Sequence, residues 1–332
     1  MAITGTGTQA DPFIVHNYTE FISLSDHASV DSGKIYIQFF DVPQQTINCN
    51  SYGSEFKWGR FVARRDVEVI IDLNGATIKN LIIDSDIAMF YAVGGNDSYP
   101  HWHPAKITVK NGAIRNVFMG SGTSRVAQGE VTFFNVSLSV NSTGNTVEPF
   151  IGISGHNMYF DNCSLYLVQA TIASSIIRYA IVTDTDFELY INNVNDRAMF
   201  TNDQFTGCRF QGKIKGRLKR DGGYQQYYFV LFGYNLNGTG GSEDIVMTNC
   251  VVDIDLSEAT GSWQGATIYI YRCENGASLN TNVFCNSHPI PYYNYPSSWN
   301  YMPHENSNNH NIRNGEYLND QGFVVVEVLA GG

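Results

Sequence analysis

The chain has 332 residues and a formal net charge of −11, from 31 Asp and Glu against 20 Lys and Arg. A nucleic-acid partner calls for a basic face, so this charge argues against one. No apolar stretch reaches the ~18 residues of a membrane span, and we expect no membrane insertion. Tyr and Phe, at 20 residues each, favour strands.

Residues 1–60 are predicted to form an N-terminal cap with a short helix. The chain opens with Gly-Thr-Gly-Thr at 5–8 and Asp-Pro at 11–12, a turn that leads into a short strand. Asn17 then precedes the best helix signal of the chain, because its side chain can cap the first amides while Glu20 reaches back. An apolar side follows at Phe21, Ile22 and Leu24.

Residues 61–285 repeat one local pattern, in which strand-forming residues lead into a sharp corner. Asn, Asp and Gly enter the left-handed backbone region at low cost, so they suit a tight bend between two strands. The residue after the bend is small, which fits an inward position where turns of chain stack about 4.8 Å apart. The corners are Asn74-Gly75, Asn111-Gly112, Asn135-Val136, Asn162-Cys163, Asp184-Thr185, Gly207-Cys208, Asn249-Cys250 and Arg272-Cys273.

These corners recur 22 to 27 residues apart, except for two longer gaps of 37 and 42 residues. A period in the low twenties is typical of a β-solenoid. Such a fold leaves an unpaired strand edge at each end, so the helix after Asn17 is predicted to cover the first edge. The two long gaps contain polar insertions, at 94–104 and 221–243, which are candidate functional loops.

Four of the six cysteines follow a corner, which predicts an interior stack of small apolar side chains in place of disulfides. These four are Cys163, Cys208, Cys250 and Cys273. Cys49 and Cys285 lie outside the stack and receive no role.

The first insertion carries His101, Trp102 and His103 between two prolines. Two imidazoles two residues apart can ligate a metal, but a closed site needs a further ligand that the sequence does not indicate. We therefore favour an exposed loop in which Trp102 contacts a glycan or a protein, and we predict no metal.

The second insertion mixes tyrosines with glycines. Aromatic rings stack on sugar faces, and this mixture combines rigid contact area with adaptable hydrogen bonding. The binding residues predicted here are Tyr224, Tyr227 and Tyr234.

Three carboxylates, Asp161, Asp186 and Glu188, are the candidates for a catalytic acid and base. Asp186 and Glu188 alternate along one strand, so they share a face and could bind a cation or flank a glycosidic bond. A solvated strand face explains them better, and no catalytic residue is assigned.

A basic stripe alternates along the chain at Lys213, Lys215 and Arg217. If the segment is one strand, these cations share a side. Two interpretations stay open: a charged face that blocks edge pairing, and a docking surface for an acidic saccharide or a protein.

Residues 286–332 change character, with prolines and aromatic residues followed by an Asn-rich run. Proline removes backbone donors, so this segment is not expected to continue the ladder of strands. A last strand, residues 323–329, is expected to close the far edge or to pair with another chain. The predicted binding residues here are Tyr292, Tyr293 and Trp299.

The asparagine corners and their flanking strands resemble the bends of right-handed parallel β-helices of the pectate-lyase-like class. Together with the opening at residues 5–12, the chain looks most like a bacteriophage tail-spike or tail-fibre protein. The resemblance implies an all-β fold: a single-stranded right-handed parallel β-helix with an N-terminal helical cap and an irregular aromatic C-terminal segment. It covers roughly residues 5–285 as architecture and says little about activity, since this fold carries lyases, hydrolases and adhesins.

Enzymes of that class use an aspartate cluster with Ca²⁺ and an arginine, or the strings Asn-Thr-Asp, Asp-Asp, Gly-His-Gly and Arg-Ile-Lys. None of these strings occurs in the chain. We therefore expect a virion structural or adhesion protein without catalysis or cofactor, which recognises a bacterial surface polysaccharide or docks on other virion proteins. The alternatives are a polysaccharide depolymerase and a bacterial adhesin.

The resemblance also implies a homo-oligomer, most simply a trimer. The residues from Met1 to Gly5 have neither the basic nor the apolar region of a Sec-type signal. We therefore expect synthesis in a host cytoplasm and a final location in the virion.

Overall fold

The structure is a computed structural model, which describes residues 3–25, 33–49, 61–64, 66–83, 88–93, 104–119, 124–145, 149–152, 157–171, 175–192, 199–201, 203–217, 246–248, 250–255, 259–260, 283–285, 309–311, 316–318 and 324–326. The chain divides into two compact units. Unit 1 holds residues 1–166 and 176–181, and unit 2 holds residues 167–175 and 182–332.

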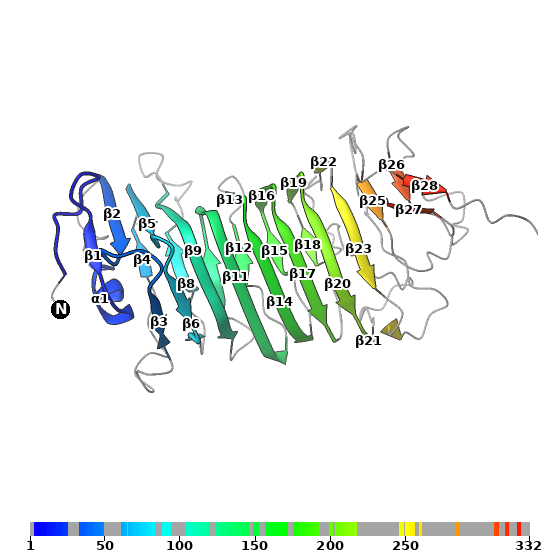
Figure 1. Cartoon of the computed structure of the whole chain (residues 1–332), viewed down its shortest axis with the longest axis horizontal. Helices are drawn as coiled ribbons and strands as arrows, with labels where there is room; N and C mark the ends of the chain where they lie inside the picture. The colour runs from blue at the N-terminus through cyan, green and yellow to red at the C-terminus, as the bar shows by residue number, and fades with distance from the viewer. Residues whose placement is uncertain are drawn as a thin grey trace, which may run out of the picture. The chain divides into compact units, whose positions relative to one another are not determined.

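Unit 1 contains two parallel sheets. In the first sheet, β1 pairs with β2, β2 with β5, β5 with β9, β9 with β11 and β11 with β13, all in parallel (Figure 1). Its strands are β1 (Phe13–Val15), β2 (Gly33–Phe39), β3 (Thr46–Asn48), β5 (Val67–Asp72), β6 (Thr77–Lys79), β7 (Ile82–Ile83), β9 (Lys106–Met119), β11 (Val131–Asn145) and β13 (Met158–Asp161).

The second sheet of unit 1 is also parallel, and its strands alternate along the chain with those of the first sheet. Its members are β4 (Phe61–Ala63), β8 (Ala88–Ala92), β10 (Arg125–Gln128), β12 (Phe150–Ile151) and β15 (Ile177–Arg178). The chain alternates between the two sheets, and each strand pairs with its counterpart one turn later. This is an all-β, parallel, solenoid-like fold.

In unit 2, β17 pairs with β20, β20 with β23, β23 with β25 and β25 with β26, again in parallel. The strands here are β17 (Asp186–Ile191), β18 (Phe200–Thr201), β19 (Gln204–Thr206), β20 (Arg209–Ile214), β21 (Gly216–Arg217), β22 (Val246–Thr248), β23 (Val251–Asp255), β24 (Ala259–Thr260), β25 (Val283–Cys285), β26 (Asn309–Asn311), β27 (Glu316–Leu318) and β28 (Val324–Val326). The chain passes between the units within β14 (Ser164–Thr171) and β16 (Ala180–Thr183).

Aromatic side chains fill the interior of each unit. In unit 1, Phe133 and Phe160 occupy the same register position on neighbouring turns and stack with ring centroids 5.2 Å apart. In unit 2, Phe187 and Phe210 do the same at 4.6 Å. Because stacked strands place equivalent residues directly above one another, one apolar residue per turn builds a continuous core.

The predicted corners are confirmed where the structure describes them. Positive φ angles of 44° to 66° occur at the corner residue of six turns. The small inward residue after the bend is buried at Val136, Cys163, Thr185 and Cys208. Gly75 departs from this pattern, because its corner is longer: Gly75 is exposed and Ala76 takes the inward place. The six corner residues are Asn74, Asn111, Asn135, Asn162, Asp184 and Gly207.

The helix predicted after Asn17 is confirmed as α1 (Tyr18–Ser23). Asn17 Oδ1 accepts a hydrogen bond from the Glu20 amide at 2.9 Å. The Glu20 carboxylate reaches back to the amide of His16 at 2.8 Å, one residue earlier than a simple capping box requires. Phe21 is fully buried and stacks on Phe61 with ring centroids 4.7 Å apart, so the helix is anchored in the core of unit 1.

The expected division at residues 60 and 285 differs from the structure. The parallel ladder already begins at β1, and it continues past residue 285 to β26. The four prolines of the C-terminal region all precede β26, so none of them removes a donor from that strand. The last strand, β28, pairs antiparallel with β27 instead of closing the ladder.

Candidate functional site

The outward side of the first sheet in unit 1 forms a surface that we call the ladder face. It consists of the outward side chains of β2, β5 and β13, of the parts of β9 and β11 that precede the corners at Asn111 and Asn135, and of Glu130 directly before β11. Alternating residues such as Val69, Ile107 and Phe133 are fully buried, which places the residues between them outside. The register arranges the outward residues in three rows. The rows are Lys34, Glu68, Lys106 and Glu130; Tyr36, Ile70, Thr108, Thr132 and Tyr159; and Gln38, Asp72, Lys110, Phe134 and Asp161.

The first row of the ladder face alternates in charge. Lys34 Nζ lies 2.8 Å from Glu68 Oε1, and Lys106 Nζ lies 2.8 Å from Glu130 Oε1. These hydrogen bonds to the carboxylates raise the pKa of Lys34 and the pKa of Lys106. The row therefore presents charges that already have partners.

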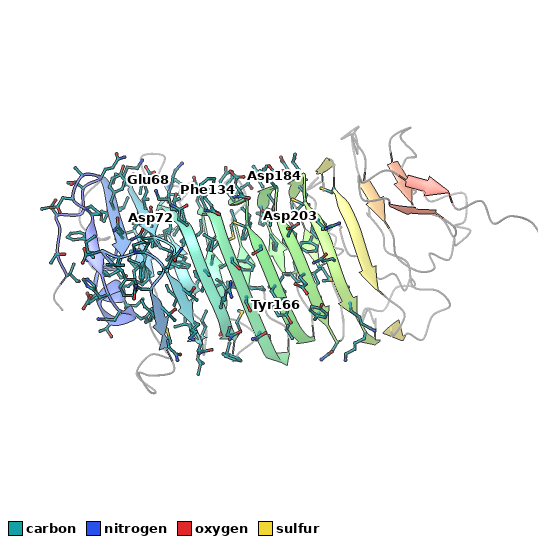
Figure 2. All side chains as sticks on the ribbon, viewed as in Figure 1. Glu68, Asp72, Phe134, Tyr166, Asp184 and Asp203 are labelled. Carbon is teal, nitrogen blue, oxygen red and sulfur yellow. The ribbon has the colours of Figure 1, made fainter. Side chains whose placement is uncertain are left out.

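The third row contains the exposed aromatic residue of the face. Phe134 is 43% exposed and lies between Lys110 on β9 and Asp161 on β13. Lys110 Nζ also contacts Asp72 Oδ2 at 3.1 Å. Figure 2 shows Asp72 on β5 and Phe134 on β11.

A ladder of side-chain amides runs beside the third row, along the corners. Asn162 Nδ2 donates to Asn135 Oδ1 at 3.5 Å, and Asn135 Nδ2 donates to Asn111 Oδ1 at 3.3 Å. Asn111 in turn donates to Asp72, so Asp72 and not Asn74 begins the ladder. Asn74 instead donates to the carbonyl of Phe40 at 3.1 Å. These hydrogen bonds between successive amides fix the positions of the corners, where the outward rows of the ladder face end.

The ladder face carries groups that can contact a polar ligand. Phe134, two tyrosines and two threonines lie among three lysines, each paired with a carboxylate, and a fourth carboxylate, Asp161. Rings and hydroxyls of this kind pack on and hydrogen-bond a polar, flat ligand such as a sugar.

The three carboxylate candidates lie on outward strand faces. Asp161 ends β13 in unit 1, next to Phe134 in register. In unit 2, Asp186 is exposed and Glu188 is half-buried on β17, opposite the buried Phe187 and Leu189 as predicted. The Tyr190 hydroxyl donates to Glu188 Oε1 at 2.8 Å.

The basic stripe does not form on one strand. β20 ends at Ile214, and Arg217 belongs to β21, which pairs with β24 in a separate two-stranded sheet. Lys213 is half-buried across from Tyr190, and Lys215 is exposed after the end of β20. The alternation in sequence therefore does not produce a row of cations on a single strand.

The remaining predicted site residues lie outside the described part of the chain. They are His101, Trp102, His103, Tyr224, Tyr227, Tyr234, Tyr292, Tyr293 and Trp299. Among the residues that the structure does describe, no group of three His, Cys, Asp or Glu side chains could hold a metal ion.

Phe134 and Tyr159 are the residues that sequence reasoning missed. A usable signal existed at Phe133-Phe134, because two adjacent aromatic residues on a strand cannot both point inward. Tyr159 follows the same logic, since it alternates with the buried Met158 and Phe160. Both lie within the predicted repeats and not in the insertions.

The buried thiols agree with the predicted stack. Cys163, Cys208 and Cys250 are buried thiols outside any disulfide, and so is Cys49, to which no role was given. Cys163 Sγ lies 3.3 Å from the carbonyl oxygen of Phe133. Cys273 lies outside the described residues.

Comparison with known proteins identifies no family. No family model matches the chain, and no curated protein matches it. The chain is similar to the crystal structure of a candidate immunoglobulin A1 protease from Bacteroides ovatus, at 12% identity over 85% of each chain and with a TM-score of 0.41. A likeness at that level adds nothing to what the chain itself indicates. Within the described residues, no helix is long and apolar enough to span a membrane.

Proposed function

We propose that this protein is a non-catalytic adhesion protein of a bacteriophage virion, a tail spike, tail fibre or similar appendage, which recognises a bacterial surface glycan. The parallel solenoid-like fold would then be a closed right-handed β-helix of the pectate-lyase-like class, with α1 covering its first turn. The resemblance of the sequence to such appendages supports the virion assignment. That resemblance also supports a homotrimer, which sedimentation velocity would detect.

The observation that carries the proposal is the position of Phe134. Its ring is exposed at the surface of a paired sheet, with a lysine and a carboxylate as its register neighbours. A ring of this kind packs against the apolar face of a sugar while flanking polar groups bind the hydroxyls. Tyr159, one turn further along and two residues earlier on its strand, lies diagonally from Phe134 and within reach of a second sugar.

The charge pairs of the ladder face support adhesion over catalysis. Glu68, Glu130 and Asp72 each have a lysine partner within 3.1 Å. Glycosidic cleavage by a carboxylate pair needs one protonated and one ionised group at a defined separation. A carboxylate already bonded to a lysine is part of a structural charge pair, which favours a contact surface.

The variant Phe134→Ala tests the role of the ladder face. We expect up to about tenfold weaker binding to the host surface polysaccharide, since an aromatic contact contributes about 0.5–1.5 kcal/mol beyond its area. Binding is measured by calorimetry or by retention on immobilised polysaccharide. The matched control is Phe118→Ala, which removes a phenylalanine of similar exposure, 38%, from another part of unit 1.

Two outcomes contradict the proposal. Equal loss of binding in both variants would show that the ladder face does not take part in recognising the glycan. Release of oligosaccharide, seen as new reducing ends or unsaturated uronate absorbance, would replace adhesion by depolymerisation.

A further inference from the structure

A pair of cations lies side by side on a second outward surface of unit 1. Lys79 on β6 and Arg115 on β9 occupy the same register position on neighbouring turns. The preceding residues, Ile78 and Ile114, are fully buried, so alternation directs Lys79 and Arg115 outward. Like charges directly opposite each other on a sheet are destabilising. In a chain with a net charge of −11, this arrangement calls for an explanation.

The surroundings of the pair differ from those of the lysines on the ladder face. On the ladder face, Lys34, Lys106 and Lys110 each contact a carboxylate within 3.1 Å. Within the described part of the chain, neither Lys79 nor Arg115 forms an ion pair. The two cations therefore keep their charge available to a ligand.

Side-chain amides border the cation pair. Asn48 is the register partner of Lys79 on the side away from Arg115. Asn116 donates to Asn80 at 3.3 Å, and Asn80 donates to Asn48 at 2.8 Å, which forms a second amide ladder beside the pair. Both Asn80 and Asn116 have positive φ, so the backbone fixes this ladder in place. Each amide has a second N–H that the ladder bond does not use.

These groups match the recognition of an anion. The guanidinium presents a planar fork that binds two oxygens of one acidic group, and the ammonium adds a point charge. Amide N–H groups supply neutral donors to the remaining oxygens or to neighbouring hydroxyls. A single carboxylate, sulfate or phosphate group bridging two turns would relieve the repulsion between Lys79 and Arg115.

We propose that Lys79 and Arg115 form an anion-binding site for the acidic group of a saccharide, either the carboxylate of a uronic acid or a sulfate or phosphate ester. The saccharide part rests on the proposed function. The recognition of the anion does not, and it is testable separately.

Calorimetric titration of the full chain with three polymers tests the site: oligogalacturonate, dextran sulfate and neutral dextran. Lys79→Gln and Arg115→Gln should each weaken binding of an anionic polymer about tenfold, and added salt should weaken binding to the unsubstituted chain. Arg115→Lys should lose less affinity, because it keeps the positive charge and loses only the planar guanidinium that binds two oxygens of one group. The polymer that binds more tightly identifies the source of the acidic group.

Arg209→Gln is the matched control, since it removes one exposed cation from β20 at a position whose register partner is Asp186. It should change affinity less than twofold. The thermal midpoint gives a second readout: Lys79→Gln relieves a repulsion and should raise Tm by about a degree, whereas Arg209→Gln relieves none and should not raise it.

The outcomes separate this site from the proposed function. Equal weakening in all three Gln variants, or no binding of either anionic polymer by the unsubstituted chain, overturns the anion site. If bacterial polysaccharide still binds through Phe134 in that case, the adhesion proposal stands. If oligogalacturonate or dextran sulfate binds through Lys79 and Arg115 but bacterial polysaccharide does not bind, the anion site stands alone.

Discussion

The side chain of Cys163 shows how burial determines chemistry at a single residue. Its sulfur is packed beside the carbonyl oxygens of Phe133 and Asp161. Burial raises the pKa of the Cys163 thiol from 9.0 to about 11, because a thiolate is poorly solvated there. The thiol is thus held in its neutral form, as expected of a small apolar core residue.

This shift makes the stability of unit 1 depend on pH in a predictable direction. The unfolded thiol ionises near pH 9 and the folded thiol only near pH 11, so the contribution of Cys163 is complete below pH 9 and is lost between pH 9 and 11. Over that range the free energy of unfolding should fall by on the order of 2 kcal/mol more in the unsubstituted chain than in Cys163→Ala. Urea unfolding at several pH values measures both slopes, and parallel slopes would contradict the prediction.

The amide ladder stabilises the structure at the scale of whole elements. Each Asn at a corner does two things: its backbone adopts positive φ, and its side chain bonds the neighbouring turn. Asparagine suits both tasks, since it tolerates the left-handed region and carries a donor and an acceptor on one short side chain. Lys110 and Phe134, which precede two of these corners, are held in place by the same ladder.

Two substitutions of Asn135 separate these contributions. Asn135→Gly keeps the bend and loses the ladder bonds, at a cost of about 1 kcal/mol in the free energy of unfolding. Asn135→Ala loses the same bonds and also leaves a Cβ in the left-handed region without the polar side chain that lets Asn tolerate it, which adds about 1 kcal/mol. Denaturant unfolding measures whether the Ala variant is less stable than the Gly variant. Equal stability would show that the left-handed backbone adds no cost for Ala.

At the scale of the whole molecule, stability in a stacked fold is a sum over neighbouring turns. Within unit 1, β9 is paired with β5 and with β11, whereas β1 has β2 on one side and a single bridge from Thr4 to Ile14 on the other. The first turn should therefore open more readily than the middle of the unit.

Hydrogen exchange in the Asn17→Ala variant tests whether α1 protects this first turn. Loss of the cap should destabilise α1 by about 1 kcal/mol and speed amide exchange in β1, while exchange in β9 stays the same. If β1 exchanges at the same rate in both proteins, α1 does not act as a lid.

Local rules explain what was predictable. The corners, the inward small residues and the α1 cap each depend on backbone preferences of a few neighbouring residues. The basic stripe at Lys213, Lys215 and Arg217 was misread as one strand, because the change of sheet after Ile214 is not visible in alternation alone. The extension of the ladder to β26 was missed because prolines nearby were taken to exclude it.

The sequence by itself determined that this protein is all-β and built from stacked turns, because the cost of a left-handed bend favours Asn, Asp and Gly at corners that recur mostly 22 to 27 residues apart. Only the tertiary structure decided which outward side chains are neighbours. Phe134 meets Lys110 and Asp161, and Lys79 meets Arg115, because the register between turns brings together residues that lie far apart in the chain. That register depends on insertions and corner lengths of whole turns, which no local pattern encodes.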